Sequence, residues 1–200
     1  MRKAVLKPHQ IQEPAVRSNT GFSLLELLIA ISVAAVAIGI AVPSFNGTIT
    51  SNQLSATANE LIGSLNLARM QAVKRNLPTQ FCTSVASHNG TDALGAACGT
   101  AVGAVYASGF SEPLANPPEI PANITITNVT ALRFGGNGLA SIATGTAPHT
   151  GLIADIYTTK VKSNNHRCIY LITGSVISSC KFTANSGGCP VDEPASCQQQ

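Results

Sequence analysis

The sequence predicts an α+β fold in which one long, bent N-terminal helix packs on an antiparallel β-rich C-terminal domain. Two observations predict it. A nearly uninterrupted apolar stretch, Phe22–Val42, continues into an amphipathic helical pattern that runs to Asn76. Beyond Pro78, short β-branched runs alternate with Gly, Pro, Asn and Ser, as in strands joined by turns. A length of 200 residues fits one domain with an appendage.

Residues 1–21 form a polar, basic segment without apolar periodicity. They contain four Lys or Arg residues and one Glu, and so contribute all of the formal net charge of +3. The remaining chain has eight basic and eight acidic residues and is formally neutral. A neutral chain gives no global electrostatic argument for binding nucleic acid or acidic partners.

Residues 22–42 are nearly all apolar and carry a single charge, Glu26, and 21 such residues are enough to cross a hydrocarbon core of ~30 Å as a helix. Lys and Arg flank this segment only on its N-terminal side, and the next basic residue is Arg69, which places the N-terminus in the cytoplasm and exports the rest. We therefore expect a single-pass membrane anchor. An ordinary secretory signal, cut after its apolar region, is the alternative. The length of the segment and its early carboxylate favour the anchor.

Residues 43–76 continue the helix as an amphipathic half. Pro43 should kink the helix where the two halves meet. The helix should end by Asn76, because Pro78 disfavours helix in the residues before it. One apolar stripe follows helical spacing and should pack on the domain that follows, residues 77–200; it consists of Leu54, Ala58, Leu61, Leu65, Ala68 and Ala72.

Eight strands are expected in the C-terminal domain, separated by loops at Asn89–Gly99 and Glu112–Pro121. Gly-rich turns after Phe134 and Thr173 indicate two hairpins. The expected strands are Thr79–Ser87, Val102–Ala107, Ile124–Thr130, Leu132–Phe134, Leu139–Ala143, Gly151–Tyr157, Arg167–Thr173 and Val176–Thr183.

Six cysteines, an even number, indicate disulfides and an oxidising compartment; buried free thiols are the alternative. Folding the last hairpin about Gly174 places Cys168 opposite Cys180, and directly opposed residues lie within disulfide reach. We therefore expect Cys168–Cys180. Proximity in sequence suggests Cys82–Cys98 and Cys189–Cys197, although six cysteines allow fifteen connectivities.

The segment Gly21-Phe22-Ser23-Leu24-Leu25-Glu26 resembles the class III signal of type IV pilins and type II secretion pseudopilins, and the resemblance extends to Pro43. It implies that a membrane prepilin peptidase cuts after Gly21, removes residues 1–21 and methylates the amine of Phe22. It also implies that Glu26 pairs with the N-terminal amine of a neighbouring subunit. An unpaired carboxylate costs roughly 2.5–3.5 kcal/mol at the membrane centre and somewhat less near the interface, which supports a functional role for Glu26. A carboxylate that snorkels to the headgroups is the alternative.

The C-terminal part resembles the GspH/FimT family of minor pilins and pseudopilins. The similarity lies in the helix segment Leu67–Asn76, the Leu132–Gly138 turn and the Arg167–Cys180 hairpin. It implies a structural subunit of an inner-membrane-anchored filament with a periplasmic domain, whose partners are other pilins or pseudopilins. A FimT/FimU-type minor pilin, placed at or near the pilus tip, and a GspH-like pseudopilin of a type II secretion system are both consistent with these motifs.

Some FimT-type members bind DNA through a Gly-Arg-x-Arg hairpin. This chain has Gly174-Ser175-Val176-Ile177 at that place and lacks both arginines. A small basic patch could still form, but a solvated edge is the favoured interpretation; its candidate residues are Lys160, Lys162, His166, Arg167 and Lys181.

Catalytic and metal-binding motifs are not evident. The histidines at 9, 88, 149 and 166 show no ligand spacing, and no G-x-S-x-G is present. Gly135-Gly136-Asn137-Gly138 lacks the Lys-Ser/Thr of a phosphate-binding loop and reads as a turn. We expect neither catalytic residues nor a metal or cofactor, and so a structural protein rather than an enzyme.

Overall fold

The structure is a computed structural model that describes residues 21–184, 187–195 and 197, and only the backbone of residues 40–44. The chain forms two compact units, residues 1–42 and 43–200. One helix, α1 (Leu24–Arg75), contributes to both. It ends as expected before Asn76, which adopts a left-handed φ of 51°. The kink expected at Pro43 falls at the boundary between the units and remains a prediction.

From Leu24 onward the first unit is the N-terminal stretch of α1, and its side chains are exposed up to residue 39. The large apolar side chains between Phe22 and Ile38 are 53–83% exposed. Within the described residues, no helix has a segment both long and apolar enough to cross a membrane.

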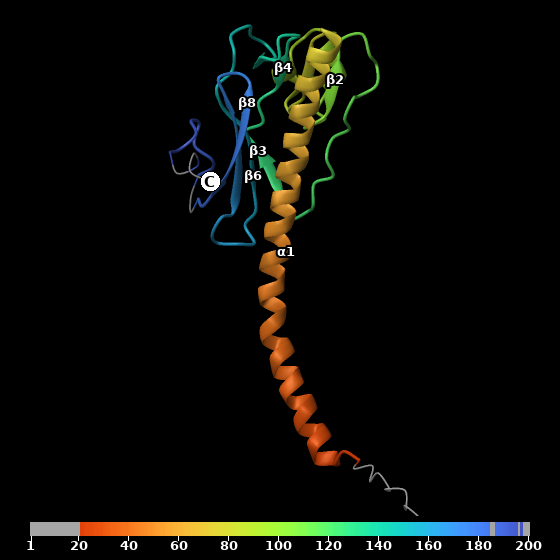
Figure 1. The fold of residues 1–200 in the computed structure, drawn as a ribbon, viewed down its shortest axis with the longest axis vertical. Helices are drawn as coiled ribbons and strands as arrows, with labels where there is room; N and C mark the ends of the chain where they lie inside the picture. Colours follow the sequence, from red (N-terminus) through yellow and green to blue (C-terminus); the bar gives the residue numbers. More distant parts are fainter. Residues whose placement is uncertain (1–20, 185–186, 196, 198–200) are drawn as a thin grey trace, which may run out of the picture. The chain divides into compact units, whose positions relative to one another are not determined.

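The second unit contains two four-stranded sheets, and every strand pairing in them is antiparallel (Figure 1). The first sheet has the order β2-β1-β4-β5 and the second β3-β6-β7-β8. The strands are β1 (Thr79–Phe81), β2 (Val105–Ala107), β3 (Thr125–Thr127), β4 (Leu132–Phe134), β5 (Ala140–Ile142), β6 (Gly151–Tyr157), β7 (His166–Ile172) and β8 (Val176–Phe182).

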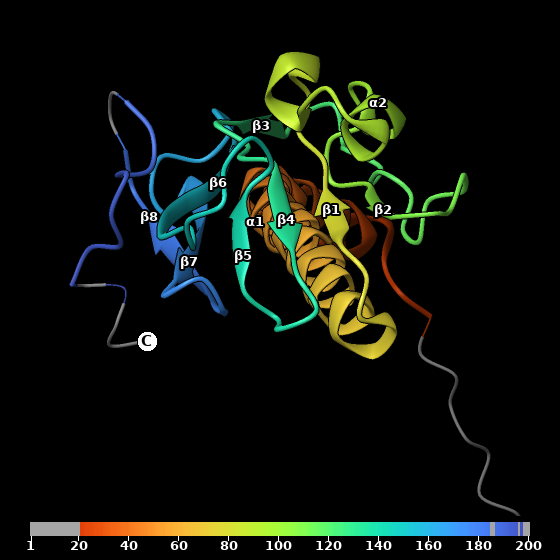
Figure 2. The same ribbon diagram turned by 90° about the horizontal axis from the view of Figure 1, so that it is seen from above.

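The core of this unit lies between α1 and both sheets (Figure 2). All six residues of the predicted stripe are buried, none more than 3% exposed. They pack in one cluster with Phe81 and Phe134 of the first sheet and with Ile153 and Ile169 of the second. Helical spacing of apolar residues therefore predicted the packing face correctly.

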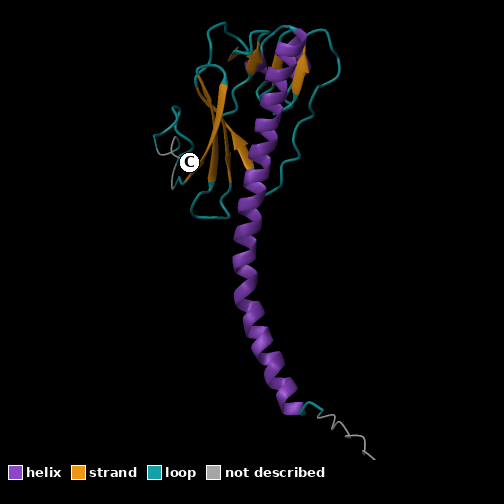
Figure 3. Ribbon diagram, viewed as in Figure 1, coloured by secondary structure: helices purple, strands orange, loops and turns teal. Residues whose placement is uncertain are grey.

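Two short helices lie in the segment between β1 and β2 (Figure 3). The predicted loop at Asn89–Gly99 is wrong, because α2 (Ala93–Cys98) forms there. The side chain of Asp92 caps α2 by accepting a hydrogen bond from the Gly95 amide at 3.0 Å.

The predicted first strand is too long, since β1 ends at Phe81 and a 3-10 helix, η1 (Ala86–Asn89), follows. The buried Asn89 side chain replaces strand pairing here. Its amide accepts from the Thr83 N–H at 2.9 Å and donates to the Thr83 carbonyl at 3.0 Å. These bonds satisfy the Thr83 backbone without a neighbouring strand.

Candidate functional site

The N-terminal motif begins α1 with a side-chain cap. The Ser23 hydroxyl accepts a hydrogen bond from the Glu26 amide at 3.2 Å, so Ser23 and Glu26 have the spacing of a capping box. Phe22, before the cap, is 82% exposed. The Glu26 side chain is exposed and forms no hydrogen bond or ion pair with any residue that the structure describes. Its position in the first turn also suits the positive end of the helix dipole.

Three disulfides join all six cysteines, so free thiols are absent from the described chain. Cys82–Cys98 forms as expected. The other two expected pairings, Cys168–Cys180 and Cys189–Cys197, are wrong. The structure instead contains Cys168–Cys189 and Cys180–Cys197.

The error concerns the C-terminal tail, the residues after β8, rather than the hairpin. Cys168 does lie directly opposite Cys180 in the β7–β8 pairing. Both sulfurs are on the sheet face away from the α1 core, in a second cluster with Tyr170 and the two tail cysteines. Cys168 and Cys180 each form a disulfide with a cysteine of the tail, so the two disulfides attach the tail to the sheet. A Cys189–Cys197 disulfide would have closed a loop within the tail without attaching it.

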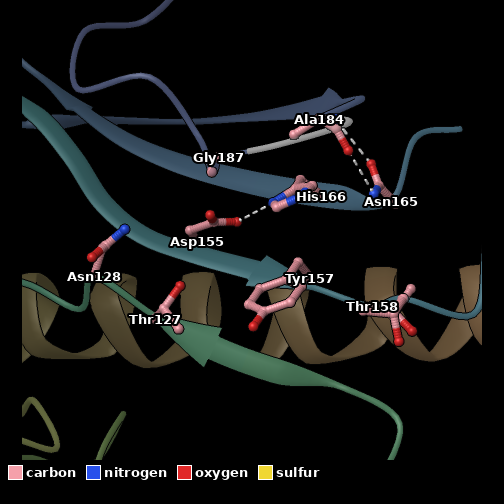
Figure 4. A pocket seen from close by; sticks show the side chains of 11 residues that line it. Thr127, Asn128, Asp155, Tyr157, Thr158, Asn165, His166, Ala184 and Gly187 are labelled. Atoms are coloured by element: carbon pink, nitrogen blue, oxygen red, sulfur yellow. Dashed lines mark hydrogen bonds and ion pairs between the residues drawn. The ribbon is translucent and has the colours of Figure 1, made fainter. Parts of the chain in front are cut away.

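A polar pocket of about 460 Å³ lies beside the tail (Figure 4). At its base is a buried pair, in which His166 Nδ1 lies 2.7 Å from Asp155 Oδ1. The ring of Tyr157 stacks on His166 with centroids 5.2 Å apart. The side chains of these three residues come from β6 and β7, whose register places Tyr157 opposite His166.

Asp155 also holds the tail. Its Oδ2 accepts a hydrogen bond from the Cys189 amide at 3.0 Å. The preceding Gly188 passes so close that a Cβ atom there would lie 2.4 Å from Asp155 Oδ2. The carboxylate thus has a partner for each oxygen, as a buried charge requires.

Asp155, His166 and Cys189 place three ligand-type atoms within 4.8 Å of one another. They do not suit a metal ion, because the Cys189 sulfur is already bonded to Cys168 and cannot act as a thiolate. The arrangement is a docking point for the tail. Sequence reasoning did not single out Asp155; the available signal was an acidic residue inside the buried strand Gly151–Tyr157.

The basic residues considered for DNA binding are not equivalent. Lys160, Lys162 and Lys181 are exposed, whereas Arg167 is 5% exposed. The Arg167 guanidinium lies against α1, where Nη2 donates to the Ser55 hydroxyl at 3.2 Å. It is therefore not displayed as a surface cation.

Two families match the chain. The prokaryotic N-terminal methylation motif matches residues 16–42. The family described as type II transport protein GspH matches residues 57–174, which is more than half of the chain. The chain belongs to the GspH family. No curated protein and no solved structure gave a match.

The GspH match and the methylation motif together identify a minor pilin or pseudopilin type of subunit, carrying a prepilin signal. The GspH match includes the buried stripe from Ala58 onward and most of both sheets. It ends at Gly174, so β8 and the disulfide-bonded tail lie outside it.

Proposed function

We propose that this GspH-family protein is a minor pilin of the FimT/FimU kind, a structural subunit that joins a type IV pilus at or near its tip and assists assembly. The observation that supports it most is the contrast within α1. The stripe in residues 54–72 is buried by the chain's own domain, whereas the apolar side chains of residues 22–38 are exposed. Such an uncovered apolar segment needs an external apolar partner, first the inner membrane and then neighbouring helices.

Processing would prepare that segment for assembly. Prepilin peptidase cuts between Gly21 and Phe22, removes residues 1–21 and methylates the new amine of Phe22. The cut removes the whole net positive charge and creates an N-terminal amine. Glu26, which has no partner among the described residues, pairs with that amine on an adjacent subunit. In a low-dielectric surrounding, leaving either charge unpaired costs more free energy than burying the pair.

A GspH-like minor pseudopilin of a type II secretion system is the second candidate. It is favoured by the description of the matching family as a type II transport protein. In either system the protein is a single-pass inner-membrane subunit with a periplasmic domain, and it acts structurally rather than as an enzyme. Deletion of the gene distinguishes the two: loss of twitching indicates the pilus, and loss of exoprotein secretion indicates the pseudopilus.

DNA uptake receives less support. The turn at Gly174 and Ser175 lacks the two arginines of DNA-binding relatives, and Arg167 is buried. Salt-sensitive DNA binding that is lost on substitution of Lys160 and Lys162 would favour it over the structural role.

The assembly role of Glu26 is tested by Glu26→Ala, with Glu60→Ala as the matched control. Both carboxylates are exposed on α1, but Glu60 lies in the unit that completes its own core. We expect Glu26→Ala to leave peptidase cleavage intact and to reduce the protein in sheared filaments at least tenfold. Glu60→Ala should match the wild type in both measurements. Wild-type amounts of the Glu26→Ala protein in sheared filaments would contradict the proposal.

A further inference from the structure

A second, smaller pocket lies where the edge strand β8 meets α1. Its volume is about 250 Å³. Two cations line it, Arg167 and Lys181, which face each other across the β7–β8 pairing. The remaining lining includes Ser55 and Asn59 of α1 and Ser179 of β8.

The charge of Arg167 is buried without a counter-ion. Among the described residues, the ion pairs are Asp92–Arg133 and Asp155–His166, so no carboxylate lies within 4.0 Å of this guanidinium. Burial lowers the pKa of Arg167. A buried cation that lacks an anionic partner is unfavourable, and any anion that reaches it is bound more strongly than at the surface.

The partners of Arg167 are all neutral oxygens. Nη1 donates to the carbonyls of Asn164 at 2.8 Å and of His166 at 3.1 Å. Nη2 makes long bonds to the hydroxyls of Ser51 at 3.4 Å and Ser55 at 3.2 Å, and Nε donates to the same Ser55 hydroxyl at 3.3 Å. These contacts use the N–H donors of the guanidinium and tie β7 to the helix, but all the acceptors are neutral, so no carboxylate among the described residues compensates the charge.

Three further donors surround the same space without a hydrogen bond to any described residue. They are the ammonium of Lys181, the hydroxyl of Ser179 and the amide of Asn59, all three on exposed residues. They come from two walls, β8 and α1, and belong to three chemical types. Donors on separate walls suit a phosphate group, which has three strong acceptor oxygens and more negative charge than a carboxylate.

We propose that this pocket binds a phosphate group, attracted by the buried charge of Arg167 and held by the free donors of Lys181, Ser179 and Asn59. Its small volume admits one phosphate with its immediate substituent. The group can belong to free phosphate or to a phospholipid headgroup, since both present the same oxygens. The pocket lies in the unit of residues 43–200, so the inference is independent of the assembly role of Glu26.

The test is thermal unfolding of the full-length chain in nonionic detergent at pH 7, in 50 mM sodium phosphate or in sodium chloride of equal ionic strength. A ligand that binds only the folded state raises the melting temperature. Phosphate also stabilises folded proteins generally, so the quantity compared is the phosphate response of each variant against that of the wild type.

Four chains are compared: wild type, Lys181→Glu, Asn59→Asp and Lys74→Glu. We expect Lys181→Glu to lose the specific response. Asn59→Asp puts a carboxylate beside Arg167, so it should melt higher in chloride and respond less to phosphate. Lys74 is an exposed lysine in the last turn of α1, far in sequence from the pocket, and Lys74→Glu should respond like the wild type. Unchanged responses of Lys181→Glu and Asn59→Asp would overturn the proposal.

The source of the phosphate is resolved by replacing it with glycerophosphoglycerol, the headgroup of phosphatidylglycerol. Equal stabilisation of the wild type, lost in Lys181→Glu, supports a lipid headgroup as the ligand. Stabilisation by inorganic phosphate alone supports free phosphate. Stabilisation by a short DNA duplex with no response to either small phosphate would overturn the proposal in favour of a nucleic-acid surface.

Discussion

The two halves of α1 differ in whether the chain itself covers their apolar side chains. From Phe22 to Ile38 the large apolar side chains are exposed, with Leu24 at 83%. From Leu54 to Ala72 the stripe residues are at most 3% exposed, because two sheets pack on them. Both halves are rich in apolar residues, so composition alone does not separate a helix that completes a core from one that needs an external partner.

The pattern of the apolar residues does separate them. An amphipathic stripe has one face to bury, and a domain on one side satisfies it. An apolar surface around the whole helix requires partners on all sides, which a bilayer or a bundle of neighbouring helices provides. The second half of α1 therefore stabilises the fold of the domain. Under the proposed function, the first half mediates assembly with other subunits.

The largest effect should come from truncating a side chain in the buried half. Leu65→Ala removes a fully buried side chain and should lower the free energy of unfolding by about 2–5 kcal/mol. Leu28→Ala makes the same chemical change in the first half, where the side chain is 59% exposed, and should leave that free energy unchanged. Urea titration of both variants in detergent measures the difference. Equal destabilisation by the two variants would remove the distinction between the halves.

The sequence predicted those parts of the fold that depend on periodic patterns. The stripe on α1, the strands Leu132–Phe134 and Gly151–Tyr157 and the register that opposes Cys168 to Cys180 are all as expected. Each follows from contacts between residues near in sequence or from side-chain alternation, which are local properties of the chain.

The parts that were missed depend on where distant segments meet. The pairing of Cys168 with Cys189 follows from the tail lying on the outer face of the second sheet, which no local pattern reveals. The same holds for Asp155, whose role appears only when Gly188 and the Cys189 amide reach it. Helix α2 is a different kind of error, because its ends had local sequence signals. Asp92 is a common N-cap residue and Gly99 a common C-terminal residue of helices.

A smaller effect on stability is expected where the tail contacts Asp155. This region resembles the buried half of α1, because its buried groups have their partners within the chain. Gly188→Ala would bring a Cβ atom against the Asp155 carboxylate and should lower stability by about 1–3 kcal/mol through overpacking. Gly63→Ala is the control, because that exposed helical glycine has open space around it and alanine should stabilise the helix by up to about 1 kcal/mol. Thermal melts that shift in the same direction for both variants would argue against a docked tail.

The smallest effect concerns pH at the same tail. The Tyr170 hydroxyl donates to the Pro190 carbonyl at 3.1 Å. Burial, with a smaller contribution from Asp155, Glu193 and Asp192, raises the pKa of Tyr170 to about 12. In the unfolded chain this pKa is about 10, so the folded state binds the proton more tightly.

The stability that this phenol contributes is therefore present below pH 10 and is lost as pH rises towards 12. Absorbance at 295 nm, which reports phenolate, should show a late-titrating component among the three tyrosines of the chain. Tyr170→Phe should remove that component, and unfolding in urea should shift it to about pH 10. If the late component persists in Tyr170→Phe, it belongs to another tyrosine, and the tail does not shield Tyr170 from solvent. The tail would then not count among the regions that the chain itself buries.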